Sequence, residues 1–153
     1  MSVLPPGSTI GILGGGQLGR MLSNAAAKLG YDTHIFTPET DSPAERVAKA
    51  VTHASYTDAG ALKAFSDQCD AITYEFENVP VESAKLLIDH GAVVRPGAKS
   101  LEMAQDRLTE KRFLQGIGIQ TVDIAEINDP KEIDAAIKAM GGQAILKLSL
   151  IHI

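Results

Sequence analysis

The chain has 153 residues, 44% hydrophobic and 22% charged, which is typical of a folded globular protein and excludes a disordered chain. Its formal net charge of −5 argues against nucleic acid and anionic membranes as partners. The single cysteine, Cys69, excludes an intrachain disulfide and is expected to fill core space. Neither a signal peptide nor an apolar run of membrane-spanning length is recognised, so we expect a cytoplasmic protein.

The first hundred residues alternate between predicted strands and helices. Strands are predicted at 9–13, 32–36, 71–74 and 93–94, and helices at 17–29, 58–68 and 81–89. Short apolar runs that end in polar or glycine residues mark the strands, and apolar residues at helical spacing mark the helices. This alternation is typical of βαβ units. We therefore expect a Rossmann-like α/β domain with a parallel sheet and helices on both faces.

The pattern changes near residues 96–106. A long charged helix is predicted at 100–114, a second helix from Asp129-Pro130 to Met140, and a strand at 143–147. We place a domain boundary here, with one domain at 1–100 and the start of another at 101–147.

A glycine-rich loop, Gly14 to Gly19, joins the first strand to the first helix. Glycines permit a sharp turn and let a ligand approach the unpaired N–H groups of the helix, where an anion is favoured. The spacing matches the dinucleotide fingerprint, but the second strand ends at Thr37, where that fingerprint has an acidic residue, and Glu39 follows in a loop. The loop therefore predicts a site for a phosphate-bearing small molecule; a tight turn without a ligand is the alternative.

Two carboxylates, Glu75 and Glu77, follow the third predicted strand. Ligands bind at this edge of a parallel sheet, and both side chains point the same way if the strand continues that far. They either accept hydrogen bonds from an amine or a ribose, or are solvated acids before the next helix. Metal binding is less favoured, because the four histidines show no ligand-like spacing.

Four segments occur together in a recognisable order. They are Gly-Ile-Leu-Gly-Gly-Gly-Gln-Leu-Gly-Arg-Met at 11–21, Asp41-Ser42-Pro43-Ala44, Thr-Tyr-Glu-Phe-Glu-Asn-Val at 73–79, and Ala-Gln-Asp-Arg at 104–107 with Glu110-Lys111. Together they resemble the N5-carboxyaminoimidazole ribonucleotide synthase family, whose members join a preATP-grasp domain to an ATP-grasp domain. The resemblance implies ATP-dependent carboxylation of 5-aminoimidazole ribonucleotide with bicarbonate in purine biosynthesis, with ATP and Mg²⁺ as cofactors and a possible homodimer.

The resemblance also implies site residues. Gly16, Gln17 and Leu18 would hold the substrate near its ribose phosphate, and Glu75 would contact it at the strand end. Arg107 and Lys147 would bind ATP. No catalytic residue is assigned within the chain, and no metal ligand.

The resemblance ends after Lys147, where the family continues into a glycine-rich phosphate loop and this chain reads Leu-Ser-Leu-Ile-His-Ile at 148–153. We therefore expect the chain as written to lack synthase activity and residues after about 106 to be poorly packed. Three alternatives remain: another purine-pathway ATP-grasp ligase such as a formate-dependent glycinamide ribonucleotide formyltransferase, a NAD(P)-binding oxidoreductase domain, and a non-catalytic nucleotide-binding module. Gln17 favours the carboxylating branch, because the formyltransferases have an acidic residue there.

Overall fold

The computed structural model describes residues 3–147, so the predicted departure at 148–153 lies outside the described residues. The chain divides into two compact units, Met1–Leu101 and Glu102–Ile153.

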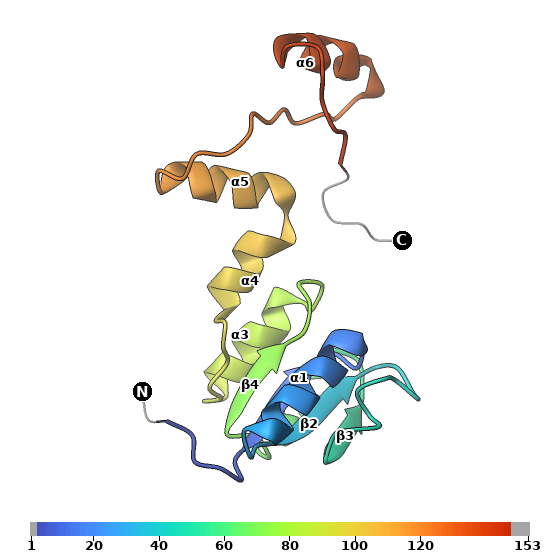
Figure 1. The fold of residues 1–153 in the computed structure, drawn as a ribbon, viewed down its shortest axis with the longest axis vertical. Coiled ribbons are helices and arrows are strands. Elements are labelled where there is room, and N and C mark those ends of the chain that lie inside the picture. Colours follow the sequence, from blue (N-terminus) through green and yellow to red (C-terminus); the bar gives the residue numbers. More distant parts are fainter. Residues whose placement is uncertain (1–2, 148–153) are drawn as a thin grey trace. The chain divides into compact units, whose positions relative to one another are not determined.

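The first unit is a parallel α/β fold (Figure 1). Its elements are β1 (Thr9–Leu13), α1 (Gln17–Lys28), β2 (Asp32–Thr37), β3 (Ala50–His53), α2 (Ala59–Ser66), β4 (Ala71–Tyr74) and α3 (Val81–Asp89). Helix α4 (Ala98–Gln105) begins in this unit and continues past its last residue, Leu101. The four strands pair in the order β3-β2-β1-β4, and every pairing is parallel. The predicted Rossmann-like α/β class is confirmed.

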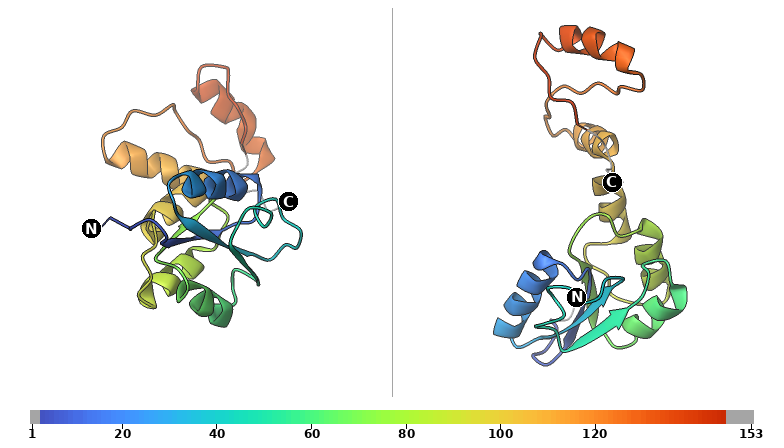
Figure 2. Two further views of the ribbon diagram at one scale, coloured as in Figure 1. Left: turned by 60° about the horizontal axis from the view of Figure 1, so that its bottom comes forward. Right: turned by 90° about the vertical axis from the view of Figure 1, so that its right-hand side faces the viewer.

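Helices cover both faces of this sheet: α1 lies on one face, and α2 and α3 lie on the other (Figure 2). Successive strand residues point to opposite faces, so Leu13 and Ile12 of β1 enter different clusters. Leu13 joins the larger core with Phe36, Phe65 and Leu87. Ile12 packs with Ile35 and Ala44 in a smaller cluster. The glycine loop follows β1 at the carboxyl edge of these buried strands.

Helix α1 begins and ends close to the predicted residues, but its apolar stripe faces outward. Leu18, Met21 and Leu29 are exposed, whereas the buried residues are Gly19, Ser23 and Ala26. The helix packs close to the loop before it, since a Cβ at Gly19 would lie 2.6 Å from the carbonyl oxygen of Gly14. Close packing leaves room only for small side chains on the buried face of α1. The spacing of its large apolar residues therefore does not identify the face that packs on the sheet.

Strand β3 was not predicted. It is a four-residue edge strand in which no residue is fully buried. An edge strand packs against one neighbour only, so its sequence carries a weak apolar pattern. At the other edge, the predicted strand at 93–94 is reduced to one parallel bridge between Ile72 and Val94.

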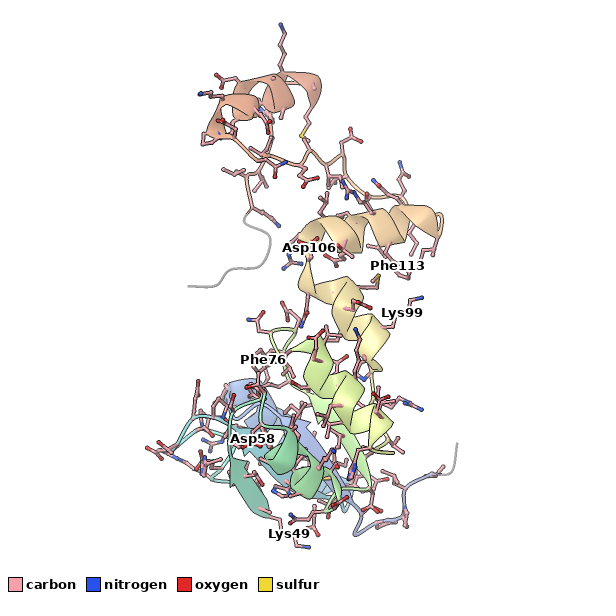
Figure 3. The ribbon with its side chains drawn as sticks, turned by 180° about the vertical axis from the view of Figure 1, so that it is seen from behind. Lys49, Asp58, Phe76, Lys99, Asp106 and Phe113 are labelled. Carbon is pink, nitrogen blue, oxygen red and sulfur yellow. The ribbon has the colours of Figure 1, made fainter. Side chains whose placement is uncertain are left out.

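The predicted helix at 100–114 is two helices, α4 and α5 (Arg107–Gly116). Asp106, labelled in Figure 3, has an extended backbone (φ −113°, ψ 126°) and interrupts the helix. Its carboxylate accepts the N–H of Thr109 at 2.8 Å and so caps α5. The prediction of one continuous helix is wrong because this cap starts a new helix.

The second unit continues with a short 3₁₀ turn at Pro130–Glu132 and α6 (Ile133–Ala139), opened by a capping box between Asp129 and Glu132. From residue 107 to 147 no side chain is buried, which confirms the expected poor packing. The strand predicted at 143–147 is not formed. A strand needs a partner for its backbone groups, and the described part of this unit contains no strand.

Candidate functional site

The glycine loop turns the chain from β1 into α1. Gly14 has φ +128°, which a side chain would strain, and its N–H donates to the carbonyl of Phe36 in β2 at 2.9 Å. Gly16 is the N-cap residue of α1, with no side chain to accept hydrogen bonds from the first turn. The N-terminus of α1 therefore needs an acceptor from elsewhere.

Glu75 supplies that acceptor. The N–H of Gly16 donates to Oε1 of Glu75 at 2.9 Å, and the N–H of Gly19 donates to Oε2. The Glu75 backbone is fixed in turn, because its own N–H donates to the carbonyl of Leu13 at 3.1 Å. A carboxylate from the end of β4 thus caps a helix 56 to 59 residues earlier in the chain, with a charge that suits the positive end of the helix dipole.

The segment after β4 is held by aromatic packing. Phe76, labelled in Figure 3, lies edge to face with Tyr56, with ring centroids 6.2 Å apart, and Tyr56 packs against Phe36 at 5.9 Å. The pKa of Tyr56 is raised to about 12, mainly by burial. A hydrogen bond with Thr37 lowers this pKa, and the charges of Glu75 and Glu39 raise it. Tyr56 therefore stays protonated at the acidic edge of the sheet.

The loop after β2 closes over the glycine loop. The N–H of Ala44 donates to the carbonyl of Gly15 at 2.9 Å. Ser42 is buried, and its N–H and hydroxyl both donate to Glu45 Oε1 at 2.8 Å, which lowers the pKa of Glu45. A Cβ at Gly15 would overlap the Ser42 side chain. The Asp-Ser-Pro-Ala motif therefore packs against the glycine loop at Gly15.

Among the predicted site residues, Gly16 and Glu75 are joined by a hydrogen bond. Gln17 and Leu18 are the first two residues of α1, beside Gly16, and both are exposed. We expected Glu75 and Glu77 to point the same way only if the strand continued through them. Strand β4 ends at Tyr74, before both residues, so this expectation does not apply. Glu77 is exposed, whereas Glu75 is half-buried.

Arg107 and Lys147 lie in the second unit. Arg107 is the first residue of α5, exposed, and donates to Glu110 at 3.3 Å. Lys147 is exposed and is not on the strand where the sequence places it. The proposed roles of both toward ATP remain predictions.

Sequence reasoning missed two side chains at this edge, Tyr56 and Glu45. Tyr56 precedes the predicted helix at 58–68 and has no motif around it. Glu45 directly follows the Asp-Ser-Pro-Ala motif, and its place three residues after Ser42 is typical of a capping pair, so that spacing is a usable signal.

Cys69 is half-buried against the larger core, as predicted, and burial raises the pKa of its thiol to about 12. Among residues 3–147, no three His, Cys, Asp or Glu side chains are placed to hold a metal ion. The use of Mg²⁺ stays a prediction from the family resemblance, and we assign no step to that ion. In the same stretch, the helices are too short or too polar to cross a bilayer.

A family model described as the ribonucleotide synthetase preATP-grasp domain matches residues 7–105. The N5-carboxyaminoimidazole ribonucleotide synthase of Brucella melitensis is 50% identical over 145 residues, which are 95% of this chain and 40% of that protein. The chain therefore spans about 40% of the length of this curated relative.

Two solved structures are similar as well. The N5-carboxyaminoimidazole synthetase of Staphylococcus aureus complexed with ADP has a TM-score of 0.79 and 40% identity, covering 90% of this chain and 37% of that one. The synthase of Aspergillus clavatus in complex with ADP and 5-aminoimidazole ribonucleotide has a TM-score of 0.78 and 25% identity, covering 89% and 37%.

Proposed function

This chain belongs to the ribonucleotide synthetase preATP-grasp domain family, and from that premise we propose that it is part of an N5-carboxyaminoimidazole ribonucleotide synthase. The whole enzyme would use ATP and bicarbonate to carboxylate 5-aminoimidazole ribonucleotide in purine biosynthesis. The similarity to N5-carboxyaminoimidazole ribonucleotide synthases supports this activity, and the similar structures solved with ADP and with 5-aminoimidazole ribonucleotide support ATP and the ribonucleotide as its ligands.

One observation of the geometry carries the assignment of the substrate site. Two of the segments that carry the family resemblance, 11–21 and 73–79, meet through the hydrogen bonds from Gly16 and Gly19 to Glu75. They meet at the carboxyl edge of a parallel sheet, where ligands of such folds bind. We place the ribonucleotide here, in contact with Gly16, Gln17, Leu18 and Glu75.

The other roles follow the family. Residues 1–100 would form the substrate-binding preATP-grasp domain, and residues 101–147 would begin the ATP-grasp domain, where Arg107 and Lys147 would bind ATP phosphates. Guanidinium and ammonium groups suit that role because they stabilise phosphate charge. We further propose a cytoplasmic protein, with bicarbonate as co-substrate and a homodimer as the assembly of the full-length enzyme.

The test is ribonucleotide binding by the 153-residue chain, measured by isothermal titration calorimetry. Binding is a better measurement than turnover, because the chain spans about 40% of its relative's length. Glu75→Ala and Gln17→Ala should each weaken binding by about ten-fold, the effect of losing one hydrogen bond of about 1.4 kcal/mol.

The matched control is Glu77→Ala, which removes an exposed carboxylate two residues away. It should bind the ribonucleotide as the unchanged chain does. Unchanged affinity in both Glu75→Ala and Gln17→Ala would refute the site, and binding of NADH without any response to the ribonucleotide would refute the function.

A further inference from the structure

We propose that His53, in its doubly protonated form, fastens the loop after β2 to the end of β3, so that the Asp-Ser-Pro-Ala motif is held against the glycine loop more tightly at acidic pH. His53 is then a positioning residue that acts through Glu45. This role goes beyond the proposed function and does not rest on it, because it concerns contacts within this chain alone.

The two nitrogens of the His53 ring both face acceptors. Nδ1 lies 2.9 Å from the backbone carbonyl oxygen of Glu39, and Nε2 lies 3.6 Å from Oε2 of Glu45, within ion-pair distance. A carbonyl and an ionised carboxylate accept hydrogen bonds and donate none, whereas a neutral imidazole has a single N–H. The protonated ring satisfies both neighbours, because it donates to the carbonyl and places its charge beside the carboxylate.

His34, on the neighbouring strand β2, has the opposite surroundings. Its Nε2 lies 2.8 Å from the hydroxyl oxygen of Thr52, which can donate as well as accept, so a neutral ring is satisfied there. Burial lowers the pKa of His34. The His53 side chain is instead 42% exposed, so it can take up a proton and keep contact with water. The partners of these two histidines thus favour different charge states.

Glu45 joins the end of β3 to the loop segment that touches the glycine loop. Its Oε1 accepts the N–H and the hydroxyl of Ser42, both at 2.8 Å, while its Oε2 faces His53. Ala44, in the same motif, donates its N–H to the carbonyl of Gly15 at 2.9 Å. Loss of the charge on His53 would leave the Ser42 hydrogen bonds in place and weaken the link to β3.

The direction of the pH effect follows from the charges. The hydrogen bonds from Ser42 and the charge of His53 lower the pKa of Glu45, so this carboxylate keeps its charge when the solution is weakly acidic. Protonation of His53 then adds an ion pair that the neutral ring lacks. The stabilisation is therefore present at acidic pH and is lost as the pH rises through the titration of the ring.

Other charged groups of the elements packed here have partners of their own. Asp41 and Arg46 of the loop pair with each other at 3.2 Å. Tyr56, after β3, stays protonated because burial raises its pKa to about 12, and the charges of Glu39 and Glu75 lie near its hydroxyl. Imidazole is the side-chain type that changes charge between about pH 5 and pH 8. A response of the loop in that range therefore reports the imidazole.

The test is hydrogen exchange of the Ala44 amide, measured by NMR as a protection factor so that the pH dependence of free-amide exchange cancels. This amide donates to Gly15, so its protection reports closure of the loop on the glycine loop. The Ile72 amide of β4, which donates to Val93 at 2.8 Å, is the reference for unfolding of the whole unit. Relative to it, Ala44 should be about three-fold better protected at about pH 5.5 than at about pH 8, as expected for one partly exposed ion pair.

Two variants separate the ion pair from the Ser42 hydrogen bonds. His53→Gln keeps a polar side chain without a charge, so it should lower the Ala44 protection factor about three-fold at about pH 5.5 and remove its pH dependence. Glu45→Gln keeps an oxygen for Ser42 but removes the charge that faces His53, so it should remove the pH dependence as well.

His90→Gln is the matched control. His90 also pairs with a carboxylate, Asp67 at 3.0 Å, but it follows α3 rather than β3. The Ala44 amide in this variant should respond to pH as it does in the unchanged chain.

Two results would overturn the proposal. One is an Ala44 protection factor that stays constant relative to Ile72 between the two pH values, which would leave Glu45 as a cap for Ser42 alone. The other is a pH response that survives in His53→Gln or in Glu45→Gln. These measurements contain no ribonucleotide, so their failure is separate from failure of the proposed function, which would appear as absent ribonucleotide binding.

Discussion

The two units have similar local signals and very different packing. The first has a parallel sheet with two buried clusters, whereas from residue 107 to 147 no described side chain is buried. Yet helices begin at capping aspartates in both units, Asp58 before α2 and Asp106 before α5. Local capping therefore places helix starts in either environment, while only tertiary burial supplies a core.

This contrast has a physical consequence for stability. Isolated helices shorter than about 12 residues are marginal in water, because nucleation is costly and packing provides most of their stability. Helices α5 and α6 have 10 and 7 residues. We expect the first unit to unfold cooperatively by itself and the second to contribute little to that transition.

The three tyrosines make this comparison measurable. Tyr31, Tyr56 and Tyr74 all lie in the first unit, and the chain has no tryptophan. Tyrosine fluorescence during urea unfolding therefore reports the first unit, and far-ultraviolet circular dichroism reports the helices of both.

The largest expected effect is that of a core aromatic residue. Phe65 is fully buried, so Phe65→Ala should lower the free energy of unfolding by about 3–5 kcal/mol through lost burial and a cavity. Phe113→Ala is the matched variant in α5, where the side chain is 40% exposed, and should leave the tyrosine transition unchanged. Equal losses would contradict the contrast between the units.

A smaller effect is expected at glycines with positive φ. Gly14→Ala combines a strained backbone with a clash against Glu75, and should cost about 1–3 kcal/mol in urea unfolding. Gly118 in the second unit also has positive φ, but a Cβ there meets nothing within 4 Å. Gly118→Ala should leave the tyrosine transition in place. A Gly14→Ala variant as stable as the unchanged chain would mean that Glu75 does not lie against the loop.

The smallest effect is expected at the two helix caps. Asp58 accepts the N–H of Ala61 at 2.9 Å, and Asp58→Ala should lower the stability of the first unit by about 1 kcal/mol. Asp106→Ala removes the corresponding cap of α5, so helicity measured by circular dichroism should fall without a shift of the tyrosine midpoint. A shift of that midpoint in Asp106→Ala would show that the two units unfold together.

Much of the first unit was predictable from local sequence. Alternating strand and helix patterns indicated the parallel α/β class, and the helix predicted at 81–89 is α3, with Pro80 before it and Gly91, at positive φ, after it. These signals work because they act within a few residues: a cap, a proline at a helix start or a positive φ does not depend on the rest of the fold.

The errors arose where partners are remote. Strand β3 exists because it pairs with β2 at the edge of the sheet, and the strand predicted at 143–147 has no described strand to pair with. The outward apolar stripe of α1 likewise depends on how closely the helix approaches the preceding loop.

The candidate site divides in the same way. The sequence by itself determined the glycine loop, the acid at the end of β4 and the family resemblance, since each is a run of adjacent residues. Only the tertiary structure placed Glu75 on the Gly16 and Gly19 amides, across 59 and 56 residues of chain. The physical reason is that parallel strands bring their carboxyl ends to one edge, and which side chain then reaches the helix start depends on strand order and register.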